Sequence, residues 1–277
     1  MFRPNSRTAL AIQLSVIGLS LSMAAASASA GDGDRDGDDQ GGGSQQCAGL
    51  PSHHQLQTAL ESARAQANGG FNLDMWGTIV NRDGVVCEVA FTGANRGSQW
   101  PGSRVISAQK ANTANAFSLP GLALSTADLY AAVQPGGTLY GLQHSNPVDT
   151  SVAYRGPASD FGQDDDPMAG HRIGGVNVFG GGLALYNSKG TLIGAIGVSG
   201  DTSCADHNIA WRTRHTLNLD FVPGGVSAAN DDNINYQGKV TVPSVPNDFS
   251  HPICKIGGVD GVSAISANLP AVQKVAP

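Results

Sequence analysis

Residues 174–219 read GGVNVFGGGLALYNSKGTLIGAIGVSGDTSCADHNIAWRTRHTLNL, and this stretch decides the fold. Residues 176–187 and 191–199 are rich in Val, Ile and Leu, a composition typical of strands. The turn between them, NSKG at residues 187–190, contains an Asn and a Gly, which tolerate the positive φ of a tight hairpin. We therefore predict two strands, the first of which folds back on the second.

The period of the pattern changes after Gly200. Small and apolar residues then recur at helical spacing, namely Ala205, Ile209, Ala210, Thr213 and Leu217. Ser203, with Asp206 three residues later, resembles a capping box at the start of this helix. The stretch thus predicts a glycine-rich hairpin that leads directly into a capped helix.

Upstream patterns predict a further hairpin and three more helices. We expect helices over residues 52–68, 103–117 and about 125–134, and strands over residues 75–81 and 85–92. The Ala, Ser and Asn side chains of the second helix permit close approach of either a flat ligand or a neighbouring backbone, and the latter is commoner. Together these elements predict an α+β fold, an antiparallel sheet of about five strands with helices on its faces.

Three stretches carry a resemblance to a known family. They are the GGG…IGAIGVSGD run with Asp206 in the next helix, the segment SAQKANTANAF at residues 107–117, and WGTIVNRDG at residues 76–84. Over roughly residues 55–220 the chain resembles the secreted haem-binding GlcG/HbpS family. This resemblance implies a profilin-like or PAS-like fold, haem as cofactor and possible assembly into a homo-oligomer.

The helix after the central hairpin carries His207, Trp211 and His215 along one stripe. An imidazole can supply an axial nitrogen to haem iron while an indole stacks on the porphyrin and Arg212 or Arg214 pairs with a propionate. His207 and His215 lie about 12 Å apart, so they cannot both bind one iron. In the alternative interpretation these rings only cover the surface beneath the C-terminal extension.

Other candidate cofactor-binding residues lie outside this helix. Residues 139–175 lack periodicity, and a loop of that length in a compact domain is usually either functional or disordered. It carries His144, His171 and several aromatic rings, which can pack or bind, so we predict an ordered flap. Lys110, in the KANTA segment, completes the candidate set, and His207 and His144 are the candidate metal ligands.

The N-terminus has the parts of a secretory signal. Residues 1–30 combine a basic start, an apolar core too short for a membrane helix and the small-residue cleavage site ASA, so we predict export to the periplasm or beyond after cleavage near Ala30. Residues 31–46, GDGDRDGDDQGGGSQQ, resemble half of a calcium loop but lack its twelfth-position Glu. We interpret them as an acidic, flexible linker. We expect an α+β domain like that of the haem-binding family over residues 47–220. An irregular C-terminal extension, with a short strand near residues 236–242, would then follow over residues 221–277.

The charge balance excludes several partners. The chain has 16 basic and 22 acidic residues, a net charge of −6, and cleavage would remove two arginines, giving −8. An acidic protein repels the phosphates of nucleic acid and anionic lipid. We therefore expect no nucleic acid partner and no membrane insertion.

The four cysteines predict two disulfides in an exported protein. Three pairings are possible. We favour Cys47 with Cys87 and Cys204 with Cys254, because each bond would tie a terminal extension to the sheet. No CxxC, HExxH or zinc-type spacing occurs, and the serine at residue 199 lacks the second glycine of a nucleophile elbow.

These observations predict an exported haem-binding protein for storage, scavenging or sensing, with a groove between sheet and helices. A haem-degrading or peroxidatic enzyme and a binding module for another small metabolite, such as a carboxylate, are the alternatives.

Overall fold

The computed structural model of the protein describes residues 45–237 and 249–275. These residues belong to one compact unit, residues 39–277. The predicted signal peptide, nearly all of the linker with its calcium-loop alternative, and most of the strand predicted at 236–242 lie outside the described residues. None of the described helices combines the length and apolar character that a membrane span requires.

Two hairpins form one antiparallel sheet in the order β2-β1-β4-β3. The strands are β1 Trp76–Asn81, β2 Val86–Phe91, β3 Gly182–Tyr186 and β4 Leu192–Ser199. The sheet thus has four strands where about five were expected. The first strand of the central hairpin is also shorter than predicted, because the preceding backbone binds helix side chains: Asn177 N–H donates to Thr113 Oγ1 (2.9 Å) and Gly180 N–H to Ser203 Oγ (2.7 Å).

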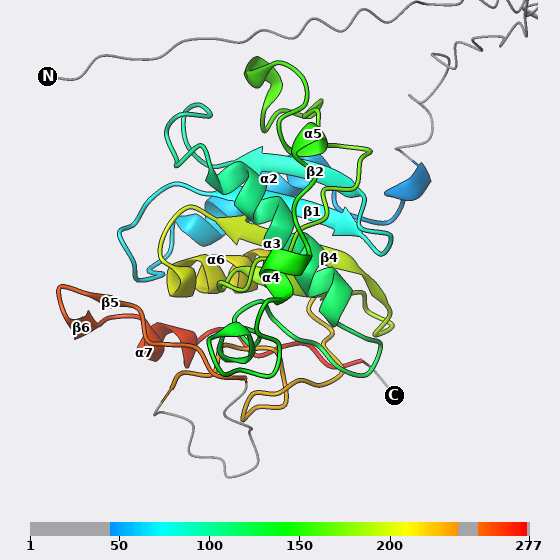
Figure 1. The fold of residues 1–277 in the computed structure, drawn as a ribbon. Helices are drawn as coiled ribbons and strands as arrows, with labels where there is room; N and C mark the ends of the chain where they lie inside the picture. The colour runs from blue at the N-terminus through cyan, green and yellow to red at the C-terminus, as the bar shows by residue number, and fades with distance from the viewer. Residues whose placement is uncertain (1–44, 238–248, 276–277) are drawn as a thin grey trace, which may run out of the picture. The chain divides into compact units, whose positions relative to one another are not determined.

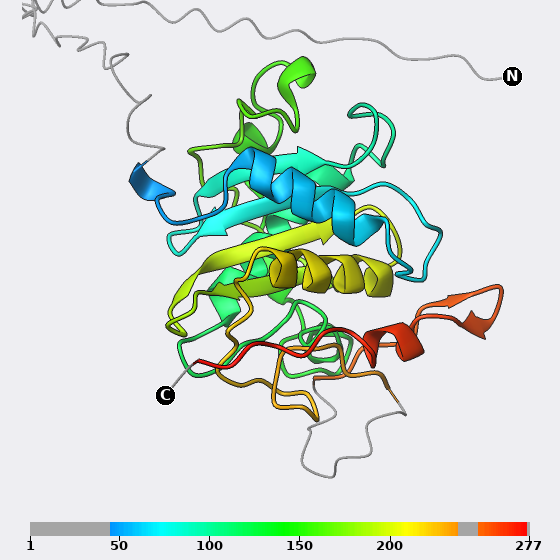
Figure 2. The same cartoon turned by 180° about the vertical axis from the view of Figure 1, so that it is seen from behind.

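Helices cover both faces of the sheet (Figures 1 and 2). The long helix α3, Ser103–Phe117, lies on one face. Helices α2, His53–Arg64, and α6, Ser203–Thr216, lie side by side on the other. A Cβ at Gly197 would collide with the Ser107 carbonyl, so α3 rests directly on the β4 backbone. The small residues of α3 therefore serve backbone approach, the commoner of their two predicted uses.

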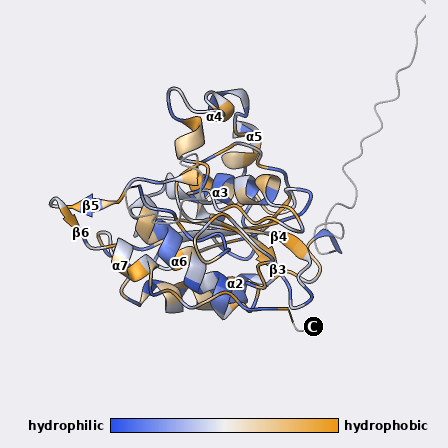
Figure 3. Ribbon diagram, turned by 90° about the horizontal axis from the view of Figure 1, so that it is seen from below, coloured by the Kyte–Doolittle hydropathy of each residue, from blue (hydrophilic) through white to orange (hydrophobic). Residues whose placement is uncertain are grey.

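The core has two layers, one on each side of the sheet. Neighbouring side chains of β4 alternate between them: Ile196 packs with Leu60 and Trp211 under α2 and α6, while Ala195 packs with Ala111 under α3. Figure 3 shows the hydrophobic colour along β3 and β4, between α3 and the α2–α6 layer. The amphipathic pattern of the helices thus produced the predicted three-layer arrangement.

Polar side chains cap the N-termini of α2 and α6 by accepting hydrogen bonds from the first backbone N–H groups of each helix. Ser52 and Gln55 form a capping box at α2. At α6 the predicted cap was off by one residue: the Thr202 hydroxyl accepts the Ala205 N–H, whereas the Asp206 carboxylate accepts the N–H groups of Gly200 and Asp201. Asp206 therefore orders the turn that precedes the helix.

Residues 139–175 form an ordered flap, as predicted, and contain the short helices α4 Leu142–Ser145, α5 Thr150–Ala153 and η2 Ala158–Asp160. The flap is joined to the sheet at Val86: its N–H donates to the His171 carbonyl, and its carbonyl accepts from the Gly170 N–H. The short helix predicted after residue 125 is instead a turn followed by the 3₁₀ helix η1, Ala131–Val133.

The C-terminal extension contains a small unpredicted hairpin, β5 Lys255–Ile256 and β6 Val259–Asp260, and the short helix α7, Ser263–Ser266. Both predicted disulfides, Cys47–Cys87 and Cys204–Cys254, are present. The second ties the extension to the first turn of α6.

Candidate functional site

Three predicted site residues of α6 are buried beneath the C-terminal extension. Trp211 Nε1 donates to the Pro270 carbonyl (2.8 Å). The Arg214 guanidinium donates to both oxygens of Asp232 (2.6 and 2.8 Å), and both side chains of this pair are 0% exposed. This is the arrangement expected from the alternative in which the rings lie under the extension.

His207 is the third of these residues and is 0% exposed. Neither ring nitrogen has a hydrogen-bond partner of good geometry, although the Asn233 side chain lies close enough to interact. Burial lowers the pKa of His207 to about 3, an effect that the nearby Asp232 carboxylate opposes. The imidazole is therefore neutral at physiological pH, and its lone pair faces the protein interior.

Lys110 projects from α3 to α6. Its Nζ donates to Asp206 (2.7 Å) and to the Val198 carbonyl (3.0 Å) in a fully buried pair. Burial raises the pKa of Asp206 to about 6 and also lowers the pKa of Lys110, while each partner opposes the shift in the other. The pair joins the helices on the two faces of the sheet, so the ammonium is not free for a ligand.

The remaining predicted histidines are dispersed. His144 is exposed on α4, on the α3 side of the sheet, opposite α6 (Figure 3). His171 is half-buried where the flap joins β2, and His215 Nδ1 contacts Asp220 (2.7 Å). His144 and His207 therefore lie on opposite sides of the sheet.

A cavity of about 530 Å³ lies beside the N-terminal end of α3. We call it the aromatic pocket. It is lined by Trp76, Asn95, Arg96, Gly97, Pro101, Gly102, Arg104, Val105, Tyr154, Ala158 and Phe161. Its walls come from the first residue of β1, the loop before α3 with the first turn of that helix, and the flap, so three distant segments build it.

The rings of the aromatic pocket are held in place. Trp76 Nε1 donates to the Trp100 carbonyl (3.1 Å), and its ring meets Phe91 edge-on at 5.3 Å. The Arg104 guanidinium lies 3.7 Å from the Phe161 ring centroid, and Arg104 Nε donates to Asp166 (2.8 Å). One wall is therefore preorganised by a buried ion pair and a cation–π contact.

Glycine at residue 162 brings the flap close to the sheet. Its φ is +79°, and a Cβ there would collide with the rings of Phe91 and Trp76. The Gly162 carbonyl accepts from His53 Nε2 (2.9 Å). Nearby, burial raises the pKa of Glu88 to about 7. This carboxyl group lies close enough to His53 of α2 and Asp164 of the flap to interact with both.

Two polar groups at the aromatic pocket are available to a ligand. Arg96 is exposed and has no partner among the described residues. Tyr154 is 66% exposed, and its phenol makes no hydrogen bond within the described part of the chain. The pocket therefore offers flat apolar walls, one free guanidinium and one phenol, a combination that suits a planar ligand bearing carboxylates.

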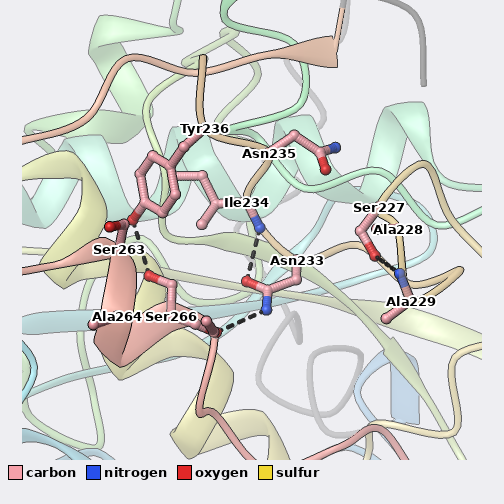
Figure 4. A pocket seen from close by; sticks show the side chains of 11 residues that line it. Ser227, Ala228, Ala229, Asn233, Ile234, Asn235, Tyr236, Ser263, Ala264 and Ser266 are labelled. Atoms are coloured by element: carbon pink, nitrogen blue, oxygen red, sulfur yellow. Dashed lines mark hydrogen bonds between the residues drawn. The ribbon is translucent and has the colours of Figure 1, made fainter. Parts of the chain in front are cut away.

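A second hollow, of about 500 Å³, lies within the C-terminal extension between residues 227–236 and 263–267. Its polar groups largely bind one another (Figure 4): the Tyr236 hydroxyl contacts Ser266 Oγ (2.9 Å), and Asn233 Nδ2 donates to the Ser266 carbonyl (3.0 Å). This hollow offers a ligand fewer free groups than the aromatic pocket.

A model of the family described as haem degrading protein HbpS-like matches residues 52–214. The chain belongs to the HbpS-like family. No curated protein sequence matches it significantly. The matched region contains the four strands β1 to β4 of the main sheet, α2, α3, nearly all of α6 and every residue of the aromatic pocket. Asp232 and His251, in contrast, lie beyond the HbpS-like region.

Solved structures similar to this HbpS-like chain include a complex of PduOC with haem, at 25% identity, with 60% of this chain and 91% of that chain covered and a TM-score of 0.42. Klebsiella pneumoniae ORFY is 24% identical over 59% of this chain and 86% of its own, with a TM-score of 0.40. A double mutant of Streptomyces reticuli HbpS is 16% identical over 60% and 86%, with a TM-score of 0.36.

The aromatic pocket was only partly anticipated. The rings at residues 154 and 161 belong to the predicted ordered flap, whose side chains we expected to pack or to bind. Trp76 and Arg96 were missed because Trp76 reads as an ordinary strand residue and Arg96 lies in a loop without a motif. The signal that could have drawn attention to them is the RGSQWPG run at residues 96–102, where Arg and Trp flank turn residues.

Proposed function

We propose that this protein binds haem in the aromatic pocket. Membership of the HbpS-like family, whose description names haem as the molecule acted on, carries the choice of ligand. The aromatic pocket supports the location, because stacked rings hold a porphyrin plane and a free guanidinium pairs with a propionate.

The residues at the pocket fit this cofactor. Trp76 and Phe161 would contact the macrocycle, Arg96 would hold a propionate, and the Tyr154 phenol is a side chain of a type that binds haem iron. Bound haem would supply redox and oxygen chemistry. The protein's own residues orient the macrocycle and exclude water from one of its faces.

We prefer this location to the surroundings of His207. A porphyrin beside His207 would need to displace the C-terminal extension, including the bidentate Arg214–Asp232 pair. The aromatic pocket needs no such rearrangement, since its free groups already face a cavity.

A hemin titration followed at the Soret band tests the proposal. We expect saturable binding by the wild-type protein. Tyr154→Phe should shift the Soret band and weaken binding about tenfold, and Arg96→Ala should weaken it about fivefold, since an exposed ion pair contributes about 1 kcal/mol.

Matched variants separate the two locations. Tyr140→Phe is the control, because Tyr140 is a similarly exposed tyrosine of the flap that does not line the pocket. His207→Ala and His144→Ala should leave the titration unchanged. Loss of binding in His207→Ala with retention in Tyr154→Phe would move the site to α6, and no binding by any protein would overturn the haem assignment.

The family description also favours a second candidate function, haem degradation. Glu88, whose pKa burial raises to about 7, can exchange a proton at neutral pH, although it does not line the aromatic pocket. Incubating the haem complex with reductant and oxygen distinguishes the functions: stable Soret absorbance indicates storage, scavenging or sensing, whereas progressive bleaching that slows in Glu88→Gln indicates degradation.

We further propose that the protein is exported. Two disulfides suit an oxidising compartment. We expect mass spectrometry of the secreted protein to show an N-terminus at Gly31, and an intact residue 1–30 segment on it would contradict the predicted cleavage. Assembly into a homo-oligomer stays a prediction from the family resemblance.

A further inference from the structure

One group of metal-ligating side chains converges in the part of the chain that the structure describes. Cys204, His251 and Cys254 each place one ligand atom within 4.8 Å of the others. Cys204 lies in the first turn of α6, whereas the other two lie in the C-terminal extension, beyond the HbpS-like region. The two sulfurs are joined as a disulfide. Sequence spacing alone did not reveal this group because 46 residues separate its two halves, from residue 205 to residue 250.

The donor set is of the type that binds zinc. Zn²⁺ binds thiolate sulfur and imidazole nitrogen in tetrahedral geometry, so two thiolates and one imidazole supply three of its four ligands. The spacing His251-Pro-Ile-Cys254 brings two ligands from one short segment, and Cys204 comes from the first turn of α6, to which the disulfide joins that segment. Water can enter at the half-buried Cys254 to fill the fourth position.

The imidazole is already oriented as a ligand. His251 Nδ1 lies 2.7 Å from the Pro252 carbonyl, which can only accept, so Nδ1 carries the proton and Nε2 carries the lone pair. Zinc-bound histidines are oriented by such a carbonyl. Nε2 now contacts Ser203 Oγ (2.8 Å), a hydroxyl that can rotate away.

We propose that Cys204, His251 and Cys254 form a redox-controlled zinc site that alternates with the disulfide. A dithiol reductant gives two electrons and two protons to the Cys204–Cys254 bond and is itself oxidised to a disulfide. Zn²⁺ then displaces the two thiol protons and binds two thiolates and His251 Nε2. The C-terminal extension is thus linked to α6 by sulfur in the oxidised protein and by metal in the reduced one.

Cobalt(II) is the spectroscopic probe for this site. The protein is reduced with a phosphine, freed of reductant under nitrogen and titrated with Co²⁺. We expect one equivalent to bind with a thiolate-to-metal charge-transfer band that zinc abolishes, and no band before reduction. Cys47→Ser/Cys87→Ser should retain the band. Cys204→Ser/Cys254→Ser should lose it, and His251→Ala should weaken binding at least tenfold.

Thermal unfolding keeps the test decisive if reduction destabilises the fold. Zinc should raise the unfolding midpoint of the reduced wild-type protein and of Cys47→Ser/Cys87→Ser, but not of Cys204→Ser/Cys254→Ser. A band that persists without Cys204 and Cys254 overturns the proposal. The proposal is also overturned if reduced Cys47→Ser/Cys87→Ser shows two free thiols per molecule but neither the cobalt band nor the zinc-dependent rise in the unfolding midpoint.

Discussion

Asp232→Ala is expected to lower the free energy of unfolding by about 3–5 kcal/mol, because it leaves the buried Arg214 guanidinium without a counter-charge. Both Asp232 oxygens accept from Arg214, and the Ala184 carbonyl accepts one further bond from the same guanidinium. Burial opposes the charge on Arg214, but the attraction of Asp232, together with that of Asp220 and Asp231, outweighs it and raises the pKa of Arg214. Alanine removes that attraction and keeps the cost of burial.

Urea unfolding followed by circular dichroism measures this effect. The double variant Arg214→Met/Asp232→Leu should recover most of the lost stability, since apolar side chains of similar size avoid the buried charge. Asp74→Ala is the matched control: Asp74 pairs with Arg64 at 3.2 Å, but both side chains are partly exposed. We expect that variant to lose about 1 kcal/mol or less. A loss of similar size for Asp232→Ala would mean that water reaches the Arg214 guanidinium.

The Arg214–Asp232 ion pair explains why part of the candidate site could not be predicted from the sequence. Arg214 was assigned to a propionate because its spacing places it near Trp211 on one helix. Its partner lies in the extension, whose path over α6 is set by tertiary packing and by the Cys204–Cys254 bond. Local periodicity carries no information about such a long-range contact, so the arginine looked free.

Local patterns predicted the elements themselves well. Helix α3 has the predicted bounds, Ser103–Phe117, because a run of small and polar helix formers ends before Pro120. Both hairpins formed at the turns expected from Asn and Gly. The disulfide pairing was also correct, since each bond joins a terminal segment to the sheet or to α6.

The aromatic pocket depends on three segments that periodicity does not connect. Gly162 decides how closely the flap approaches Trp76, and in the sequence it is one glycine among 37. The exposed Arg96 has no partner among the described residues, whereas the buried Arg104 and Arg214 are each paired with an aspartate, a difference that the sequence does not reveal. Elements are thus encoded locally in this chain, whereas the ligand-accessible surface follows from how loops pack.

His207→Leu is expected to stabilise the protein, and increasingly so as the pH falls. At pH 7 leucine removes two buried nitrogens that lack good hydrogen bonds, a gain of about 1–2 kcal/mol. Burial lowers the pKa of His207 from its ordinary 6.5 to about 3. Between these values the unfolded chain binds a proton that the folded protein does not, so the wild type loses stability as the pH falls below 6.5.

One proton that only the unfolded chain binds lowers the free energy of unfolding by about 1.4 kcal/mol per pH unit. The stability advantage of His207→Leu over the wild type should therefore grow by about 2 kcal/mol between pH 7 and pH 5. Denaturant unfolding of both proteins at the two pH values gives this difference directly. The charged and titratable groups around the ring, Asp232, Arg214 and His251, are present in both proteins, so their own titrations largely cancel. His144→Leu, at an exposed histidine, should show no such trend. An advantage that stays constant with pH would mean that the folded protein protonates His207, and that the ring is reached by water or by a partner from the C-terminal extension.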